Sequence, residues 1–587
     1  ILIYGGIFMF KVAFDNKDKT DKTIYIKHSY SVKGVKKQMI IEKYPSANEL
    51  DAKYGSWESF IDERIKVLTE EKKAQDNDKK EIKIDYSSPI SLDGCQNSFN
   101  FGYLLMQKVY HHLGLDQFFY HLKNNNSLRI KYSLNDVMKF LVYTRAIAPG
   151  SKLDNSKKIN YFAESFDITI DDIYDALDRF DDCKEKLQDY LYKKASYLLP
   201  PPDKVVFYDV TNFYYEIEEE NEICAYGVEK NHRPDPITSF GLFMDSNGIP
   251  IKYSAYRGNI NENKQLLPEW KKLEPSLEGD GYILCSDAGL NSANIKHYLI
   301  TKNNHYIFSQ SVKKLGNATK EEIFDEKGWL SLSSDKKYKI KKFKKDSYID
   351  DPYSKNKSGK SKVDIDTMYI FIFDENRRKF MLNKIEEREK KAREIISNPS
   401  RFDKVSSTDG KQYIQKLCYD DNGEIVVEKS ILNLNTELIE KEKQYAGYGA
   451  IVTDLFDESV TDIINIASRR WEIEDCFRQM KTGFSTRPIY LRTIKHIHAH
   501  FLTCYVALTI VKLLENKYLK GITSNNLFEV LRNTTFVKLP TGDWMAGNIS
   551  KEAVQSFKKM EFNNLLFNYL SNKTFIKIIS SSKQKYQ

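Results

Sequence analysis

The sequence lacks the cysteine and glycine patterns that mark several common protein classes. Its seven cysteines are scattered singly along 587 residues, with no C-x-x-C pair. An odd number of isolated cysteines argues against a disulfide framework and against a zinc ribbon, and it indicates a reducing compartment, the cytoplasm. No stretch matches G-x-x-x-x-G-K-S/T or G-x-G-x-x-G, so an ATP-driven motor and a dinucleotide-dependent enzyme are disfavoured.

Long apolar runs are also missing. The longest run inside the fold, residues 501–514, is interrupted by Lys512 and falls short of the roughly 20 residues that a membrane span needs. We therefore expect a buried core helix there and no membrane partner. The opening ILIYGGIFMF has neither a basic n-region nor a small-residue cleavage site, so it does not match a signal peptide. Because the chain begins with Ile1, Met9 is the expected true start.

The overall composition is that of a multi-domain globular protein. Hydrophobic residues make up 41% and charged residues 29% of the sequence, which is enough apolar material for packed cores and too much for a disordered chain. Lysine and arginine (90) exceed aspartate and glutamate (82), giving a net charge of +8. This mild excess permits a polyanionic partner without requiring one.

Changes in sequence pattern divide the chain into six expected segments. After Pro202, three antiparallel strands are followed by alternating strands and helices, so we predict an α/β fold with a mixed sheet. The segments are an N-terminal β-hairpin unit with a charged helix (1–90), a helical module (91–202), the first part of the α/β core (203–312), an inserted lysine-rich, β-containing domain (313–447), the second part of the core (448–515) and a C-terminal helical segment (516–587).

Two aspartates are notable because they occur within or directly after apolar strands. Asp209 interrupts VVFYDVTNFYYE, where an uncompensated buried carboxylate would be costly. Asp287 ends the strand of YILCSDAGL, and ligand groups collect at the carboxyl ends of strands in α/β sheets. Each has a structural alternative, because Asp209 can be satisfied by local backbone N–H groups and Asp287 can cap the following helix. Neither aspartate decides the function alone.

A third group lies in ASRRWEIEDCFRQMKTGF, within a helix expected over about 460–482. At about 100° per residue, four side chains fall within roughly 80° on one face of this helix. They are one acid and three flanking cations: Glu474, with Arg470, Arg478 and Lys481. The opposite side is apolar and can pack against a core. An ordinary surface ladder of ion pairs is the structural alternative.

Two aspartates on one sheet and a glutamate on a later helix can converge on divalent cations. Oxygen ligands alone suit Mg²⁺ or Mn²⁺ rather than zinc. Two such ions can activate a water or a 3′-hydroxyl and stabilise the leaving oxygen of a phosphodiester displacement. The three histidines at 496, 498 and 500 are not expected to bind metal, because on a helix the middle one points away from the other two.

In order along the chain, these stretches resemble the bacterial insertion-sequence DDE transposases, in the group with a Tyr-x-x-Arg-x-x-x-Glu-x-x-x-x-x-x-Lys signature around the last acid. The matching stretches, between about residues 95 and 515, are FYDVTNFYYE, YGVEKNHRPDPI, GLFMDSNGIPI, YRGNINENKQLLP, CSDAGLNSANI, RRWEIEDCFRQMKTGF and RPIYLRTIKHIHAHF. The resemblance implies an RNase H-like catalytic domain interrupted by a β-rich insertion. It also implies that Asp209, Asp287 and Glu474 form the catalytic, metal-binding triad for Mg²⁺ or Mn²⁺, with two ions expected.

The same resemblance implies the partners. Double-stranded DNA would be bound at the terminal inverted repeats of the element and at the target, by a homodimer acting on paired ends in the bacterial cytoplasm. Arg470 and Lys481 would contact DNA near the cleaved end, with Arg478 beside them. The inserted strand KKYKIKKFKK is expected either to track phosphates or to be a solvated, lysine-guarded edge. Its candidate DNA contacts are Lys339, Lys341, Lys342 and Lys344.

One departure from the signature is visible, because Ala467 stands where the signature has its tyrosine. In the family that tyrosine helps to handle the DNA end. The expected function is cut-and-paste DNA transposition by metal-dependent cleavage and strand transfer. Two alternatives stay open: a catalytically impaired DNA-binding remnant, which Ala467 suggests, and a stand-alone metal-dependent nuclease that cuts without needing specific ends.

Overall fold

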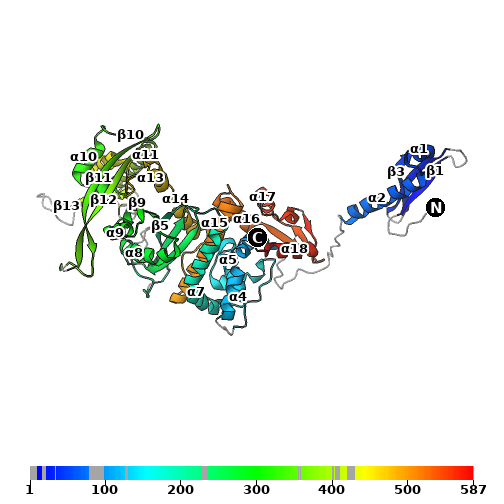
Figure 1. Ribbon diagram of the computed structural model, residues 1–587, viewed down its shortest axis with the longest axis horizontal. Coiled ribbons are helices and arrows are strands. Elements are labelled where there is room, and N and C mark those ends of the chain that lie inside the picture. The colour runs from blue at the N-terminus through cyan, green and yellow to red at the C-terminus, as the bar shows by residue number, and fades with distance from the viewer. Residues whose placement is uncertain are drawn as a thin grey trace. The chain divides into compact units, whose positions relative to one another are not determined.

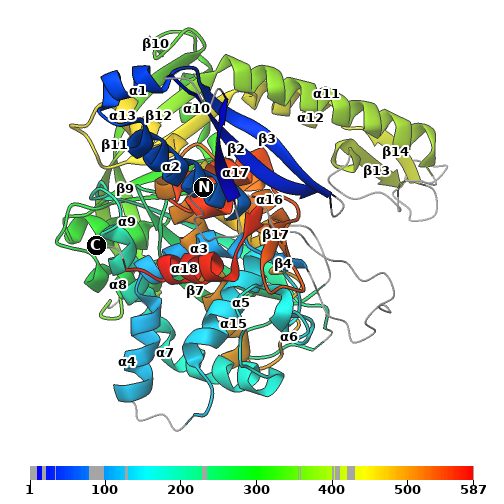
Figure 2. The same ribbon diagram turned by 90° about the vertical axis from the view of Figure 1, so that its right-hand side faces the viewer.

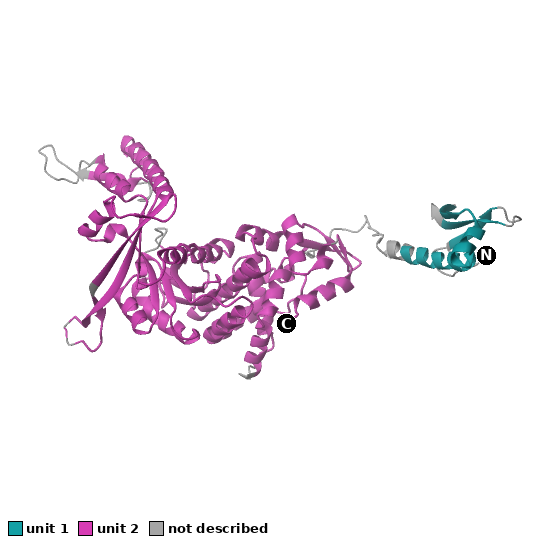
Figure 3. Cartoon of the chain, turned by 45° about the horizontal axis from the view of Figure 1, so that its top comes forward, with its two compact units in different colours: residues 1–95 teal, residues 96–587 magenta. Residues whose placement is uncertain are grey.

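The computed structural model describes residues 9–15, 21–32, 35–77, 98–125, 130–217, 219–227, 235–354, 356, 358–399, 402, 410–418, 430–566 and 568–585. The chain divides into two compact units, residues 1–95 and 96–587, which Figure 3 colours separately. The residues before Met9 and residues 228–234, within YGVEKNHRPDPI, lie outside the described residues.

The first unit is a three-stranded antiparallel sheet with two helices, in the strand order β1-β2-β3. Its elements are β1 (Met9–Asp15), β2 (Thr23–Val32), β3 (Val35–Tyr44), α1 (Ala47–Tyr54) and α2 (Trp57–Asn77). The alternation in β2 points Ile24 and Ile26 to one side of the sheet, where they pack with Leu50, Ile61 and Ile65 of the helices. The unit thus has a core of its own.

A nine-stranded mixed sheet forms the centre of the second unit (Figure 1). Its strand order is β10-β11-β12-β15-β9-β8-β5-β6-β7. The β5–β8 and β8–β9 pairs are parallel and the other pairs antiparallel. The strands are β5 (Val205–Tyr214), β6 (Ile237–Asp245), β7 (Pro250–Arg257), β8 (Ile283–Ser286), β9 (His305–Gln310), β10 (Leu330–Ser331), β11 (Lys336–Asp350), β12 (Lys360–Asp374) and β15 (Tyr448–Thr453). The predicted α/β fold with a mixed sheet is confirmed.

Helices cover both faces of this sheet, and the two-residue period of the strands divides their side chains between the faces. In β5, β8 and β9, odd-numbered residues such as Cys285 and Ile307 join a core with Phe477 of α14, on what we call the α14 face. Even-numbered residues of these strands, such as Leu284 and Phe308, join a core with α8, α9 and α10, on the α8 face. The helices are α8 (Glu262–Leu273), α9 (Ala293–Thr301), α10 (Asn317–Phe324), α13 (Val460–Ser468) and α14 (Trp471–Arg478).

Part of the expected insertion joins the central sheet, and residues 414–418 and 430–434 in its remainder form a separate two-stranded sheet. Its long hairpin of β11 and β12 extends the central sheet, because β12 pairs with β15. Ile370 of β12 joins the core of the α14 face, whereas Tyr369 and Phe371 join that of the α8 face, as in a strand buried on both sides. The remainder has a small core around Tyr413. It comprises α11 (Glu375–Ser397), β13 (Ile414–Cys418), β14 (Ser430–Leu434) and α12 (Thr436–Tyr445).

A helical module precedes the sheet, with α3 (Tyr103–His112), α4 (Leu115–Asn125), α5 (Leu134–Ile147), α6 (Lys152–Ser156) and α7 (Ile170–Ser196). The apolar helix α15 (Ile494–Leu513) packs against α5 and α7 (Figure 2). Among the described residues, the helix Ile494–Tyr518 is long and apolar enough to cross a membrane, but 94% of its apolar window is buried inside the protein. The prediction of a buried core helix is confirmed. The cysteines whose side chains are described are free and buried.

The sequence pattern predicted a helical C-terminal segment, but the structure also contains strands there. Three short strands, β16 (Thr535–Lys538), β17 (Trp544–Ala546) and β18 (Tyr569–Leu570), run between α16 (Ser524–Asn533), α17 (Lys551–Lys559) and α18 (Asn572–Ser582). Together with β4 (Ser98–Asn100) they form a four-stranded sheet in the order β18-β17-β16-β4. The prediction was wrong because strands of so few residues show too little alternation to be recognised in a sequence.

Candidate active site

Asp209 and Asp287 lie at the same level of two neighbouring parallel strands. In the β5–β8 pairing, Phe207 is the partner of Cys285, and each aspartate comes two residues further along its chain. The backbone of Asp287 is still extended, with φ −80° and ψ 176°. Residues in such register point to the same face, and neighbouring strands are about 4.8 Å apart. The fold therefore brings the two carboxylates together on the α14 face.

Local hydrogen bonds fix both aspartates. Asp287 Oδ1 accepts hydrogen bonds from the N–H groups of Gly289 (2.9 Å) and Leu290 (3.2 Å), so Asp287 does cap the following turn. Both bonds use Oδ1, which leaves Oδ2 outside the cap. Asp209 is half-buried, and its Oδ1 accepts a hydrogen bond from the N–H of Val210 at 2.8 Å. Both aspartates therefore do make the local backbone hydrogen bonds that the structural alternatives predicted. For Asp287 the cap engages only one of the two carboxylate oxygens.

Ser309 extends this level to a third strand. Because Ser286 pairs with Phe308 in the β8–β9 ladder, Asp287 comes next to Ser309. Arg470 Nη1 donates a hydrogen bond to Ser309 Oγ at 2.8 Å. Asp209, Asp287 and Ser309 therefore form a row across β5, β8 and β9, which we call the carboxylate row, and Arg470 lies at its end. Sequence analysis missed Ser309 because only the strand register reveals it.

Glu474 approaches the row through Arg470. Its Oε1 lies 3.9 Å from Arg470 Nη2, and its side chain is 63% exposed while that of Arg470 is 19% exposed. The Nε of Arg470 is buried without a hydrogen-bond partner among the described residues. Arg470 thus stands between the glutamate and the end of the row.

The helix that carries Glu474 is shorter than the sequence pattern predicted. The expected helix over about 460–482 is broken: α13 ends at Ser468, and α14 begins at Trp471 with Arg470 as its N-cap. A π-turn, Gln479–Gly483, follows α14. The apolar side of α14 docks as expected, and Cys476 Sγ lies 3.8 Å from Met244 Sδ of β6. The break turns Arg470 inward, toward the sheet.

The three cations expected beside Glu474 do not share one role. Arg470 contacts Ser309, whereas Arg478 pairs with the buried carboxylate of Asp475. Lys481 is half-buried in the π-turn and has partners of its own. The helix break precedes Arg470, so Arg470 and Arg478 belong to the same helix, whereas Lys481 lies in the π-turn. Their contacts with DNA stay predictions.

The lysines of β11 divide between the two faces of the sheet. Lys339 is buried, and its Nζ donates to the backbone carbonyls of Glu322 (2.7 Å) and Asp325 (2.8 Å). Lys341 pairs with Glu322 on the same side. These two were expected to contact DNA; in the structure their ammonium groups make contacts within the chain, and DNA contact by them stays a prediction.

Lys342 and Lys344 point to the other side. Lys342 pairs in register with Met368, a residue of the α14-face core, and both lysines are exposed. Lys344 Nζ lies 3.4 Å from Asp364, with 70% of its side chain exposed. These two lysines therefore lie on the face that carries the aspartates. Four strand spacings separate β11 from β8, which is about 19 Å.

The donor groups fit a hard divalent cation, but the three acids are not gathered around one point. In the part of the chain that the structure describes, no group of three or more His, Cys, Asp or Glu side chains is close enough to hold a metal ion. The two aspartates offer oxygen donors on adjacent strands, which suits Mg²⁺ or Mn²⁺. Glu474 is held by Arg470 instead. The aspartate pair is thus the preformed part of the site.

Two of the three histidines, His496 and His498, connect α15 to α7. His498 Nδ1 lies 2.9 Å from Asp181 Oδ1, and His496 Nε2 lies 3.5 Å from Asp178 Oδ1, both on α7. Burial, followed by the charge of Lys184, lowers the pKa of His498 below its ordinary value. These contacts fasten α15 to α7.

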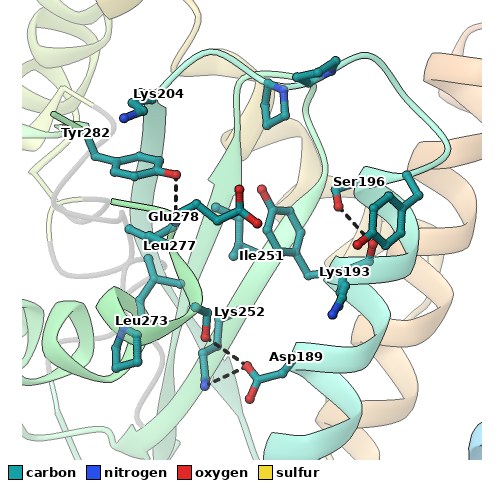
Figure 4. A pocket seen from close by; sticks show the side chains of 16 residues that line it. Asp189, Lys193, Ser196, Lys204, Ile251, Lys252, Leu273, Leu277, Glu278 and Tyr282 are labelled. Carbon is teal, nitrogen blue, oxygen red and sulfur yellow. Dashed lines mark hydrogen bonds and ion pairs between the residues drawn. The ribbon is translucent and has the colours of Figure 1, made fainter. Parts of the chain in front are cut away.

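A cavity of about 720 Å³ lies at the opposite end of the sheet, where β5, β7 and β8 begin (Figure 4). Two of the lysines that line it are engaged with neighbours. Lys252 Nζ lies 3.3 Å from Asp189, and Lys204 Nζ donates to the carbonyl of Asp280 at 2.7 Å. Because Lys204 and Tyr282 precede β5 and β8, this cavity is separate from the aspartate pair, which comes further along both strands.

Comparison with known proteins gives one match to a protein family. Residues 240–510 match the family described as "Transposase DDE domain". The matched segment is a little less than half of the chain; it contains Asp287, Arg470 and Glu474 and begins after Asp209. No curated protein matches the sequence.

Among solved structures, one similar chain is the piggyBac transposase in a synaptic complex with hairpin DNA. The identity is 8%, with 73% of this chain and 80% of that chain covered and a TM-score of 0.35. A likeness this loose identifies no residue of the site. What the comparisons do establish is that the segment carrying Asp287 and Glu474 is similar to transposase DDE domains.

Proposed function

We propose that this chain is a DNA transposase that binds the terminal inverted repeats of an insertion sequence and catalyses cleavage and strand transfer of the phosphodiester backbone. One observation carries the proposal: two aspartates stand in register on neighbouring parallel strands, and the second lies inside the segment similar to transposase DDE domains. An RNase H-like arrangement of the core is part of this proposal.

The roles of the acids follow from their positions. Asp209 and Asp287 would hold divalent cations, Mg²⁺ or Mn²⁺, and Glu474 would complete the set. Bound as a pair, such ions activate a water or a 3′-hydroxyl and stabilise the leaving oxygen. For Glu474 to join, its ion pair with Arg470 has to open. The two groups are 3.9 Å apart and the side chain of Glu474 is 63% exposed to water, so the pair contributes no more than about 1 kcal/mol and its opening costs little.

The proposed DNA path runs across the α14 face. Arg470 lies at the end of the carboxylate row, and Lys342 and Lys344 are exposed on the same face, on a strand about 19 Å from the strand that precedes Asp287. Phosphate contacts of this type position a duplex without reading its sequence. Arg478 and Lys481, which follow Glu474, are the remaining proposed contacts. Action as a homodimer on paired ends is part of the same proposal.

A second candidate is a DNA-binding remnant without catalysis. Two observations favour it: Ala467 occupies the position of the signature tyrosine, and Glu474 is not gathered with the aspartates. The presence of all three acids favours the enzyme. A nuclease that cuts without specific ends is the third outcome, and the substrate requirement distinguishes it.

The test is cleavage of labelled DNA that carries the flanking ends of the gene, with Mg²⁺, with Mn²⁺ and with EDTA. We expect cutting at the ends that requires a divalent cation and falls by at least about 1,000-fold in Glu474→Gln. The matched control is Glu458→Gln, because Glu458 is an exposed acid before α13, outside the carboxylate row. Its cleavage rate should equal that of the wild type.

Each other result points elsewhere. Undiminished cutting by Glu474→Gln contradicts the triad. Equal cutting of DNA without the ends identifies a nuclease. End binding without cutting, with either ion, identifies the remnant, and Ala467→Tyr is then the variant that should restore cutting.

A further inference from the structure

A cavity of about 240 Å³ lies beside α15, away from the carboxylate row. Four parts of the chain line it: residues between Arg145 of α5 and Lys152 of α6, residues 485–491, His500 of α15, and Tyr174 of α7. The second of these follows the π-turn after α14. The cavity thus joins the helical module to the segment that comes directly after the helix of Glu474.

Buried cations line this cavity, and some of their donor atoms have no hydrogen-bond partner among the described residues. Lys152 is 4% exposed, and its Nζ is such an atom. Arg145 is 2% exposed; its Nη1 donates to the carbonyl of Phe484 at 3.1 Å and its Nη2 to that of Gly150 at 3.4 Å, while its Nε has no partner in the same described part. Arg487 lines the same cavity, and its buried Nη1 is likewise unpartnered.

Among the described residues, no carboxylate forms an ion pair with Lys152, Arg145 or Arg487. Burial, followed by the charge of Arg145, lowers the pKa of Lys152 to about 7, while the Cys504 thiol acts in the opposite sense. Burial and then the charges of Arg145 and Lys152 hold the pKa of His500 well below its ordinary value. The acid nearest in sequence, Asp154, is exposed and pairs with Lys158 at 2.9 Å.

An unpaired buried cation is strongly unfavourable, so proteins pair such groups or supply a ligand. An oxyanion is the ligand that best fits these donors, because each of its oxygens can accept a hydrogen bond from a different donor. We propose that the cavity binds an oxyanion of the phosphate class, with Lys152, Arg145 and Arg487 as its donors. The site is separate from the proposed metal site and shares no residue with it.

The position of the cavity suggests where the phosphate comes from. The N–H of Ile489, in its wall, donates to the carbonyl of Tyr214 at the end of β5 (3.1 Å). Asp209 is five positions earlier on that strand, about 17 Å away. At the rim, Tyr490 is 65% exposed and offers an aromatic surface. A backbone phosphate of bound DNA and a free phosphate-bearing molecule share the chemistry, and the first source rests on the proposed function.

The first arm of the test uses inorganic phosphate alone. Thermal unfolding of the full chain is measured in increasing sodium phosphate and in sodium chloride of equal ionic strength. Phosphate should raise the Tm by about 1 to 3 °C above chloride. In Lys152→Met this difference should disappear. In the control Lys157→Met, which removes an exposed lysine of the same segment, it should stay unchanged. Equal Tm values of the wild type in both salts would overturn the proposal.

The second arm distinguishes the two sources of phosphate. Binding of DNA carrying the element ends is measured over a series of salt concentrations. If DNA supplies the phosphate, Lys152→Met should weaken binding by about 10- to 100-fold and reduce the salt slope by about 0.9. If the ligand is a free molecule, Lys152→Met should leave the binding of DNA ends unchanged but still abolish the effect of phosphate on Tm. Either of these two outcomes supports the oxyanion site. A phosphate effect that persists in Lys152→Met contradicts it.

The result is independent of catalysis. Glu474→Gln should keep the full phosphate effect on Tm even though it loses cleavage. A chain that binds phosphate at Lys152 but never cuts DNA would refute the proposed function and leave the oxyanion site standing.

Discussion

Two buried lysines in this protein have opposite surroundings. Lys512 of α15 is 6% exposed, and its Nζ contacts Asp475 Oδ2 at 2.8 Å and Glu515 Oε2 at 2.9 Å. Lys152 is equally buried and has no partner in the described part of the chain. Burial alone would lower the pKa of each lysine. For Lys512, the Cys476 thiol and then the two carboxylates outweigh burial and raise the pKa above its ordinary value.

The difference shows that burial does not by itself define the role of a charged side chain. Lys512 is satisfied within the chain and holds α15 to α14 as part of the fold. The ammonium group of Lys152, with two arginines beside it, lacks a hydrogen-bond partner in the described part of the chain. We therefore assign a structural role to Lys512 and a ligand-binding role to Lys152.

The sharpest way to break this comparison is to make the same substitution at both positions. Lys512→Met should destabilise the protein by about 3 to 5 kcal/mol, because it leaves the carboxylates of Asp475 and Glu515 buried without their cation. The free energy of unfolding from urea titration measures this. Removing both partners, in Asp475→Leu with Lys512→Met, should recover part of the loss.

Lys152→Met should change stability in the opposite direction. Without anion, the substitution removes an unpaired buried ammonium group and should stabilise the protein by about 1 to 3 kcal/mol. The same urea titration, in a buffer free of phosphate and sulfate, measures it. A destabilisation as large as that of Lys512→Met would mean that Lys152 has a structural partner.

The pH dependence of anion binding sharpens the contrast further. Sulfate keeps its charge between about pH 6 and 9, so it reports on the protein alone. Since Lys152 has a pKa of about 7 in the empty site and an anion favours the charged form, sulfate affinity should be full below pH 7. Above pH 7 it should fall by up to about tenfold per pH unit, because binding then requires protonation of Lys152.

The other groups that face Lys152 do not produce this trend. Arg145 and Arg487 keep their charge over the range, and the pKa of His500 lies well below it. The Cys504 thiol acts on Lys152 in the opposite sense to Arg145. Lys152→Met is the control for all of them, because any pH dependence that it retains belongs to another group.

The two sites also differ in how far the sequence predicted them. Asp209 and Asp287 could be recognised because a carboxylate interrupts or ends an apolar strand, which is visible in a few consecutive residues. Their common level, and the place of Ser309 beside them, depends on strand register, which no local pattern contains. That Lys339 and Lys342 lie on opposite faces of the sheet could likewise not be predicted, because strand pairing decides which face of the sheet each residue occupies.

The oxyanion site could not be predicted at all. Lys152 lies in SKLDNSKK, a polar stretch with the composition of a surface loop. Its burial results from packing against residues 485–491 and α15, more than 300 positions later in the chain. The break before Trp471 was missed for a related reason: the apolar period of the helix continues across Arg470, while the tertiary contact with Ser309 decides where α14 begins.

The smallest expected effect concerns the outer partner of Asp475. Arg478 contacts Oδ1 of the carboxylate whose Oδ2 receives Lys512, but 67% of the Arg478 side chain is exposed. Water screens this pair, so Arg478→Gln should lower the free energy of unfolding by no more than about 1 kcal/mol. Its effect on binding to DNA ends should be larger than its effect on stability if Arg478 contacts a phosphate, with the salt slope reduced by about 0.9. A loss of stability as large as that of Lys512→Met would show that the exposed and the buried cation hold Asp475 equally, and the distinction between paired and unpaired burial would then not explain the two lysines.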